Sequence, residues 1–295
     1  MSQQVKVFNA GHTACSGCGL SLAARLIMEA AGPNVIVTNS TGCLEVFTTR
    51  SPQTAWGVPW VHSLFENSGA LATGIVAAMK AEGRENEARV MAFGGDGSTA
   101  DIGFGIISGM WERGDDVLYV CFDNEAYMNT GIQRSGLTPF MGATSTSPAG
   151  SVTGGNQKQK KNIPMIAVAH DVKYVATASV GYQRDLQNKI KKALAIKGPK
   201  YIQVLVTCPL GWGSDSALTI QMGKLAVETG IYPLYEVEGG KITNVMNVAK
   251  PKPVEEYLKL QTRFKHIMKK PEEIAKVQAI ADANFKKYTK DRVLC

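Results

Sequence analysis

The chain has little that would place it in a membrane or outside the cell. Its 295 residues contain no apolar run of transmembrane length, and the first residues lack the charged and apolar segments of a secretory signal. Six cysteines in a chain this long do not form the framework of a small disulfide-rich secreted domain. We therefore expect a cytoplasmic protein without a membrane interaction.

The sequence also lacks the pattern of a nucleic-acid-binding protein. Its net charge is +7, but no basic stripe interleaved with aromatic residues accompanies it. Many of the lysines lie in the loop 158–161 and after residue 265. We interpret them as solvated surface, with an acidic protein partner as the second interpretation, and we expect no nucleic-acid partner.

The residues that are present indicate an α/β protein. An apolar fraction of 44% supports a sizeable core, and strand-like and helix-like patterns alternate up to about residue 210. This alternation predicts a doubly wound, mostly parallel sheet. The predicted strands are 34–38, 90–93, 117–122 and 201–207, and the predicted helices are 20–31, 68–80, 99–113 and 183–195. Two further short segments, 166–169 and 174–178, are strands or a short αβ unit.

The pattern changes after residue 210. We expect a helix at 217–229, strands at 231–237 and 242–248, and helices at 254–267 and 271–288. We assign residues 1–235 to one domain and residues 236–295 to a C-terminal extension that packs on this domain or on a partner subunit. No internal repeat is present.

Polar turns close both predicted strands of the segment 88–131. The first strand ends at Gly-Gly-Asp96-Gly and the second at Asp-Asn124-Glu. Glycines let a backbone approach a phosphate, and a carboxylate tolerates a diphosphate when Mg²⁺ lies between them. Asp96 and Asn124, one βα unit apart, thus predict a metal–diphosphate clamp. The turn is neither a Walker A loop nor a dinucleotide fingerprint. A polar turn without a ligand is the plain alternative.

Four cysteines form a second candidate site. Cys15 and Cys18 make a CxxC turn directly before a predicted helix, and Cys43 and Cys208 each follow a predicted strand. A thioredoxin-like pair would follow a strand, which is not seen here, and zinc usually takes a second CxxC or a histidine pair. An iron–sulfur cluster takes four thiolates, which can be scattered along the chain. Cysteine spacing alone leaves zinc and iron–sulfur equally open.

The other two cysteines have simpler interpretations. Cys121 lies within the predicted strand 117–122 and is expected to be a small buried apolar residue. Cys295 ends the chain.

Several blocks of the sequence together resemble one family. These blocks are AGHTACSGCG, NSTGCLEV, TAWGVPWVHSLFEN, AFGGDGSTADIGFG, DNEAYMNTGIQRSG, TSTSPAG and VEEYLKLQTRFKHI. They span nearly the whole chain and resemble the beta subunit of pyruvate:ferredoxin oxidoreductase and related 2-oxoacid enzymes. The resemblance implies the diphosphate-binding half of the thiamine diphosphate-binding fold within residues 1–235, with Mg²⁺ and one 4Fe–4S cluster.

The resemblance also implies roles for individual residues. The cluster ligands would be Cys15, Cys18, Cys43 and Cys208. The Mg²⁺ ligands would be Asp96, Asn124 and the main-chain carbonyl of Ala126. Gly97, Ser98, Asn129 and Thr130 complete the cofactor-binding set, although no particular role follows for Ser98. Asn129 is also the candidate catalytic residue, as a donor towards substrate or cofactor.

The implied reaction is the oxidative decarboxylation of a 2-oxoacid, with pyruvate as the default and acetyl-CoA and CO₂ as products. The cofactor acts as an electron sink, and the cluster passes electrons to ferredoxin. Oxalate or another 2-oxoacid is the alternative substrate. Two alternatives belong to other classes: a non-redox thiamine-dependent decarboxylase or synthase with structural cysteines, and a zinc-binding interaction protein.

One part of such an enzyme is absent from the expected domains. Thiamine enzymes of this kind take an activating glutamate from a separate pyrimidine-binding domain. We therefore expect an alpha subunit to supply it, gamma and ferredoxin-like delta subunits or domains to complete the complex, and the chain to be inactive alone.

Overall fold

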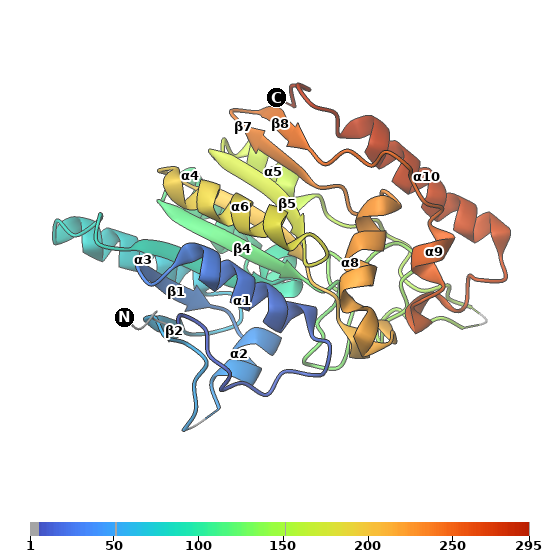
Figure 1. The fold of residues 1–295 in the computed structure, drawn as a ribbon, viewed down its shortest axis with the longest axis horizontal. Helices are drawn as coiled ribbons and strands as arrows, with labels where there is room; N and C mark the ends of the chain where they lie inside the picture. Colours follow the sequence, from blue (N-terminus) through green and yellow to red (C-terminus); the bar gives the residue numbers. More distant parts are fainter. Residues whose placement is uncertain (1–5, 51, 151, 295) are drawn as a thin grey trace.

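The computed structural model describes residues 6–50, 52–150 and 152–294, built around one eight-stranded sheet (Figure 1). The strand order is β2-β1-β3-β4-β6-β5-β7-β8. The first six strands in this order pair in parallel. Strand β7 pairs antiparallel with β5, and β8 pairs antiparallel with β7. The bounds are β1 Val35–Asn39, β2 Trp60–His62, β3 Arg89–Gly95, β4 Val117–Asp123, β5 Tyr174–Ser179, β6 Lys200–Leu205, β7 Tyr235–Glu238 and β8 Lys241–Val245. The predicted doubly wound, mostly parallel sheet is confirmed.

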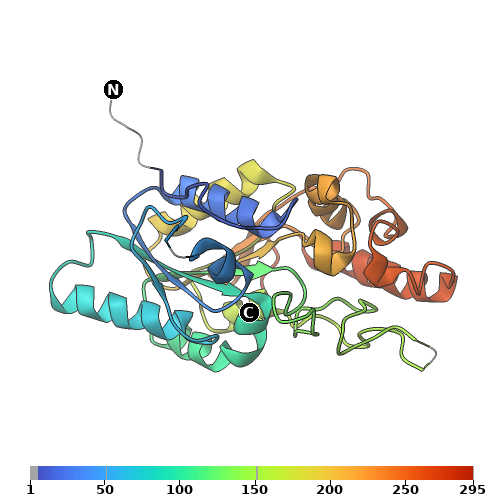
Figure 2. The same cartoon turned by 90° about the horizontal axis from the view of Figure 1, so that it is seen from below.

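Helices cover both faces of the sheet, as the edge-on view shows (Figure 2). Helices α1 (Gly19–Ala31) and α6 (Gln183–Ala195) pack together on one face, and α3 (Ser68–Ala81), α4 (Phe104–Glu112) and α5 (Ile163–Ala169) lie on the other. Strand β4 is therefore buried along its whole length, because a parallel strand between two helical layers has no solvent face. This burial explains its nearly continuous apolar sequence.

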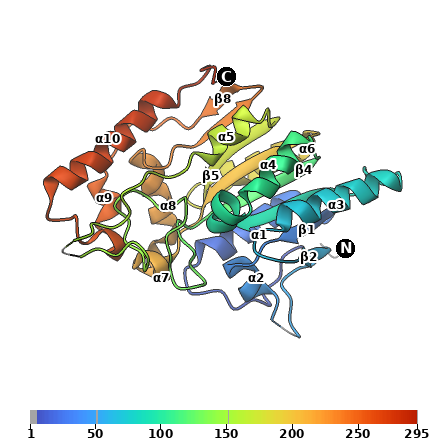
Figure 3. The same cartoon turned by 180° about the vertical axis from the view of Figure 1, so that it is seen from behind.

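The C-terminal part adds a third cluster of apolar side chains. It contains α8 (Thr219–Glu228), the short helix α9 (Glu255–Leu258), the 3₁₀ turn η3 (Thr262–Phe264) and α10 (Pro271–Lys287). Figure 3 shows the long connection between β4 and α5 running beside α7 (Pro209–Trp212), α8 and α9. The predicted boundary after residue 235 falls within β7, which pairs with β5 and continues the sheet. The division into two parts stays a prediction.

Among the described residues, no helix combines the length and the apolar character needed to cross a membrane. Three short elements were not predicted, namely α2 (Cys43–Thr48), β2 and α7 (Pro209–Trp212). None exceeds six residues, so none is long enough to display a helical or alternating period. The alternative at 166–178 resolves into helix α5 followed by strand β5.

The predicted helix 99–113 is wrong in its first turn. A π-helical turn, η1 (Ser98–Ile102), comes first, and α4 starts only after Gly103. Gly103 N donates to Ser98 O over five residues at 2.9 Å, and a Cβ on Gly103 would lie 2.4 Å from that same oxygen. The wider turn therefore depends on a glycine at this place, and such π-turns are frequent at functional sites.

The predicted helix 254–267 is also wrong, because it is interrupted. Gln261 has an extended backbone, with φ −130° and ψ 119°, and separates α9 from η3. Its side chain donates to Tyr257 O at 2.8 Å. Arg263, two residues further on, is buried in an ion pair with Glu125. Tertiary contacts thus override the helical pattern. The strand predicted at 231–237 is shorter than expected and begins at Tyr235, after Pro233, which has no N–H to donate.

Candidate active site

Four adjacent parallel strands end at the same edge of the sheet, and each leads into a predicted site residue. Strand β1 leads to Cys43, β3 to Asp96, β4 to Asn124 and β6 to Cys208. Strand β2, which follows β1 in the sequence, lies beside β1 on the side away from β3. Strand β4, which follows β3, lies beside β3 on the side away from β1. The chain thus changes direction between β1 and β3, which is where open α/β sheets bind ligands.

A cavity of about 50 Å³ lies at this edge. All seven predicted cofactor-binding residues line it, namely Asp96, Gly97, Ser98, Asn124, Ala126, Asn129 and Thr130. The lining further includes Thr41, Gly42, Cys43, Phe65, Gly95, Tyr127 and Met128. The structure therefore brings the two polar turns together and places a predicted cluster cysteine beside them.

Three oxygen-bearing groups converge in this cavity. One terminal atom of the Asn124 amide lies 2.8 Å from Asp96 Oδ1 and 2.7 Å from the Ala126 carbonyl oxygen. With its nitrogen at this position the amide donates to both oxygens; with its oxygen there, three oxygen atoms face one another. Oxygens that bind Mg²⁺ at 2.0–2.1 Å lie about 2.9 Å apart in an octahedron. The donor set and its spacing fit Mg²⁺.

Asp96 is buried against this site and has a neutral partner. It is 1% exposed and accepts a hydrogen bond from the hydroxyl of Ser135. Burial raises the pKa of Asp96 well above its usual range, and the nearby Asp123 carboxylate raises it further. A cation bound at the site would oppose both effects by stabilising the ionised carboxylate. Sequence reasoning missed Ser135, although it lies in one of the blocks that carry the family resemblance.

Close packing explains one glycine of the turn 95–98. A Cβ on Gly97 would lie 2.2 Å from the ring of Tyr127, which donates to Asp101 Oδ2 at 3.0 Å. Sequence reasoning missed Tyr127 and Asp101 too, because only the fold brings η1 into contact with the turn that follows β4. Asn129 and Thr130 are exposed at the cavity, where Thr130 Oγ1 donates to Gln133 Oε1 at 2.6 Å.

Two glycines let the CxxC turn pack closely against the segment 207–216, which follows β6. A Cβ on Gly17 would lie 2.3 Å from Ser216 O, and one on Gly19 would lie 2.6 Å from Thr207 N. Gly19 N donates to Thr207 O at 3.0 Å. Because Thr207 directly precedes Cys208, these contacts hold the start of α1 beside the fourth predicted cluster cysteine.

The four predicted cluster cysteines are near enough to influence one another's ionisation. Burial raises the pKa of Cys43 to about 12, with further contributions from Cys208, Cys18 and Cys15. Burial likewise raises the pKa of Cys208 to about 11, and Cys18 and Cys15 raise it further. Four neighbouring thiols are the donor set that a 4Fe–4S cluster requires.

Within the described ranges, no three His, Cys, Asp or Glu side chains are placed to hold a single metal ion. Cys121 is 0% exposed within β4, as expected for a packing residue, and Cys295 lies outside the described residues.

A larger cavity of about 330 Å³ lies between the loop 159–164, the segment 231–235 and α10. Lys160 forms part of its wall. Lys160 also forms ion pairs with Asp123 and Glu125, the acidic neighbours of Asn124, and so connects this cavity to the turn 123–126, called the metal turn below.

The fold and the site define a class, and comparison with known proteins agrees with it. Residues 40–204 match the family described as thiamine pyrophosphate enzyme, C-terminal TPP binding domain. The chain is 54% identical to pyruvate synthase subunit PorB of Methanosarcina barkeri, over 94% of this chain and 95% of that protein. It is 45% identical to ketoisovalerate oxidoreductase subunit VorB of Pyrococcus abyssi, over 90% and 88% respectively. The chain belongs to the 2-oxoacid:ferredoxin oxidoreductase family, as its beta subunit.

A solved structure shares the fold. It is 2-oxoglutarate:ferredoxin oxidoreductase from Magnetococcus marinus with 2-oxoglutarate, coenzyme A and succinyl-CoA bound, with a TM-score of 0.58 and 24% identity. The match covers 70% of this chain and 69% of that chain. At this identity the likeness shows the fold alone.

Proposed function

We propose that this subunit carries the thiamine diphosphate site and one 4Fe–4S cluster of a complex that oxidises pyruvate to acetyl-CoA and CO₂ and reduces ferredoxin. One observation supports the proposal above all others. The oxygen donors of Asp96, Asn124 and Ala126 and the thiols of four cysteines meet at one sheet edge. A non-redox thiamine enzyme would need only the first of these two groups.

Each group of residues has its own task. Asp96, Asn124 and the Ala126 carbonyl hold Mg²⁺ against the diphosphate, while the backbone of the turn at 95–98 approaches the phosphates. Asn129, exposed at the cavity, orients the substrate by donating a hydrogen bond. Bound thiamine diphosphate supplies the electron sink for the loss of CO₂.

The cysteines serve electron removal. Cys15, Cys18, Cys43 and Cys208 hold the cluster as thiolates, and its one-electron chemistry suits transfer to ferredoxin. Cys43 lines the cofactor cavity, so the two cofactors share a wall of the protein.

Anaerobic purification of the whole complex tests this assignment. About four iron and four sulfide per beta chain, together with bound thiamine diphosphate, are expected. A colourless protein that binds thiamine diphosphate would point instead to the non-redox alternative, and zinc without thiamine to an interaction protein.

Pyruvate is the proposed substrate because the relative at 54% identity is named pyruvate synthase. The relative named ketoisovalerate oxidoreductase supports another 2-oxoacid as the second candidate. Turnover of pyruvate, 2-oxobutyrate, oxalate, branched-chain and aryl 2-oxoacids by the complex, with and without coenzyme A, separates these possibilities. The highest kcat/KM for pyruvate, dependent on coenzyme A, is the expected result.

We further infer that an alpha subunit supplies the activating glutamate and that gamma and delta subunits or domains complete the electron path. The isolated beta chain should therefore show no turnover with thiamine diphosphate, Mg²⁺ and pyruvate, and addition of the other subunits should restore it. Full turnover by the isolated chain would contradict the shared site. The cytoplasmic location stays a prediction.

A further inference from the structure

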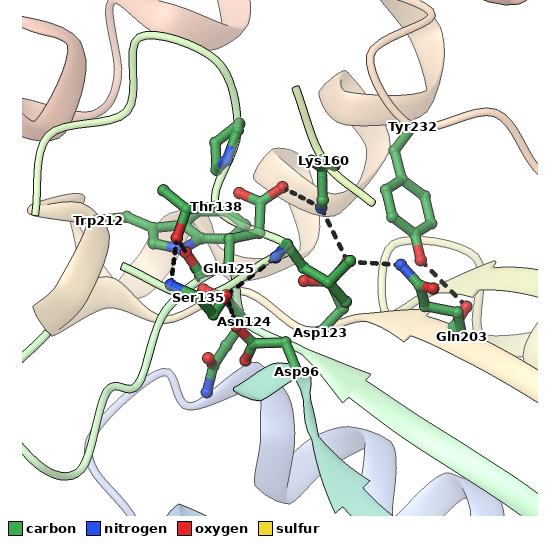
Figure 4. A network of polar contacts seen from close by, with 12 residues as sticks. Asp96, Asp123, Asn124, Glu125, Ser135, Thr138, Lys160, Gln203, Trp212 and Tyr232 are labelled. Carbon is green, nitrogen blue, oxygen red and sulfur yellow. Dashed lines mark hydrogen bonds and ion pairs between the residues drawn. The ribbon is translucent and has the colours of Figure 1, made fainter. Parts of the chain in front are cut away.

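The proposed metal ligand Asn124 lies between two buried acids. Asp123 and Glu125 are 0% and 1% exposed, so neither carboxylate is solvated by water. Lys160 bridges them, with Nζ 2.8 Å from Asp123 Oδ2 and 2.7 Å from Glu125 Oε1 (Figure 4). Arg263 donates to the other oxygen of Glu125 at 2.5 Å. Two cations thus balance two acids in this buried network.

The two cations reach the turn from distant parts of the sequence. Lys160 comes from the long connection between β4 and α5, and Arg263 comes from the 3₁₀ turn η3 near the C-terminal end. The backbone of the turn needs such support, because Glu125 has φ of 72°, in the left-handed region that non-glycine residues rarely adopt. Thr138 Oγ1 also donates to Glu125 O at 2.7 Å.

Arg263 has a second contact that Lys160 lacks. Its guanidinium lies 4.1 Å from the ring centre of Trp212, and Trp212 Nε1 donates to Asn124 O at 2.9 Å. Trp212 belongs to α7, whose N-cap is Cys208. Arg263 therefore touches both the metal turn and the helix that starts at a predicted cluster cysteine, whereas Lys160 contacts the metal turn.

We propose that Lys160 and Arg263 are positioning residues that hold the Asn124 turn for Mg²⁺ binding, and that Arg263 also fixes the Cys208 turn through Trp212. This inference rests on the proposed function. The two cations should differ in their effects. Loss of Lys160 weakens the binding of Mg²⁺ and thiamine diphosphate and leaves the cluster unchanged. Loss of Arg263 weakens the same binding and also changes the surroundings of the cluster.

The experiment compares variants of the assembled complex, purified without oxygen. Two readouts are used: the Mg²⁺ concentration for half-maximal thiamine diphosphate binding, and the EPR spectrum and reduction potential of the cluster nearest the thiamine site. K160M should raise the required Mg²⁺ about tenfold or more, as outer-shell changes at metal sites do, and leave the cluster signals unchanged. R263M should raise the Mg²⁺ requirement and also shift the cluster signals.

Matched controls come from the same segments. Lys158 and Lys265 are exposed, and K158M and K265M should behave as wild type in both readouts. K160R keeps a charge that can reach both acids, and the cavity beside Lys160 gives the larger guanidinium room, so K160R should restore most of the Mg²⁺ affinity.

K160M leaves two buried acids with one cation, which can prevent folding. The double variant K160M/D123N removes one acid and keeps the buried charge balanced. It should fold and still require more Mg²⁺, because the bridge across Asn124 is gone. Wild-type Mg²⁺ dependence in this double variant, or unchanged cluster signals in folded R263M, would overturn the proposal. Failure of the proposed function itself would show differently, as a wild-type complex that binds no thiamine diphosphate or holds no cluster.

Discussion

The amino and carboxyl edges of the parallel sheet both bury charged side chains, but with opposite balances of acid and base. At the amino ends of the strands, Asp116 is surrounded by Lys200, Arg89 and Lys197, and it also accepts from the backbone N–H of Gly198 at 3.1 Å. One carboxylate there has three cations. Burial alone raises the pKa of Asp116, but Lys200, the backbone N–H of Gly198 and Arg89 together outweigh it, and the net pKa is lowered.

At the carboxyl edge, three buried carboxylates share two cations. Lys160 and Arg263 balance Asp123 and Glu125, whereas Asp96 is held by a hydroxyl and has a raised pKa. The amino edge is therefore electrostatically complete and contributes to stability. Among the residues that the structure describes, the three carboxylates of the carboxyl edge have one cation too few, and a bound cation would supply the missing positive charge.

Removal of a predicted cluster cysteine at the carboxyl edge should have the largest effect. Cys208→Ala should lose the cluster, measured as iron and sulfide per beta chain, and with it the reduction of ferredoxin. Cys121→Ala is the matched control, because Cys121 is buried inside β4. It should retain iron at a stability cost of about 1 kcal/mol. Full iron content in Cys208→Ala would remove this residue from the ligand set.

Asp96→Asn should lower Mg²⁺ affinity and turnover of the complex by roughly 100-fold or more, since even outer-shell losses at metal sites cost 10–100-fold. Stability of the cofactor-free subunit should stay the same or rise, because a buried carboxylate is replaced by a neutral group of the same size. Titration with Mg²⁺ and urea denaturation measure the two effects. A loss of stability with unchanged Mg²⁺ affinity would assign Asp96 a structural role.

Asp116→Asn should show the reverse pattern. The side chain of Lys200 is only 2% exposed, so losing its partner should lower the free energy of unfolding by about 3 kcal/mol. Turnover per folded complex and Mg²⁺ affinity should not change. The contrast between the two edges fails if this variant folds normally but binds Mg²⁺ weakly.

The smallest effect concerns pH. The folded-state pKa of Asp116 lies below its unfolded value of about 4. Ionised Asp116 therefore adds to the free energy of unfolding above pH 4, and this contribution is lost as the pH falls through the lower folded value. Asp116→Asn should therefore lose less stability than wild type between pH 5 and 3. Asp96 has the opposite sign, since a raised pKa makes the cofactor-free fold less stable as pH rises through it. Urea denaturation at several pH values would measure both slopes, and parallel slopes for wild type and Asp116→Asn would contradict the first assignment.

Much of this edge could be predicted from the sequence. Parallel strands end together, so the residues directly after 90–93, 117–122 and 201–207 had to lie at one edge of the sheet. Local patterns could not place Ser135 and Lys160, because both reach the site from a connection without helical or strand periodicity. They could not place Arg263 either, because the helical pattern of 254–267 is interrupted just before it. The interruption at Gln261 shows the same limit, since a contact with Glu125, far away in the sequence, decides where Arg263 lies.

The α/β class, the family and the two turns that hold the candidate ligands follow from the sequence, because strand period, glycine spacing and cysteine position are local properties. The meeting of the Asn124 amide with the Asp96 carboxylate and the Ala126 carbonyl within hydrogen-bond distance is a property of the folded chain. The pairing of Lys160 and Arg263 with the acids beside Asn124 likewise arises only in the fold. Such convergence depends on the order of the strands and on long-range ion pairs. Burying a charge costs free energy unless an opposite charge, such as a side chain or a bound cation, pairs with it.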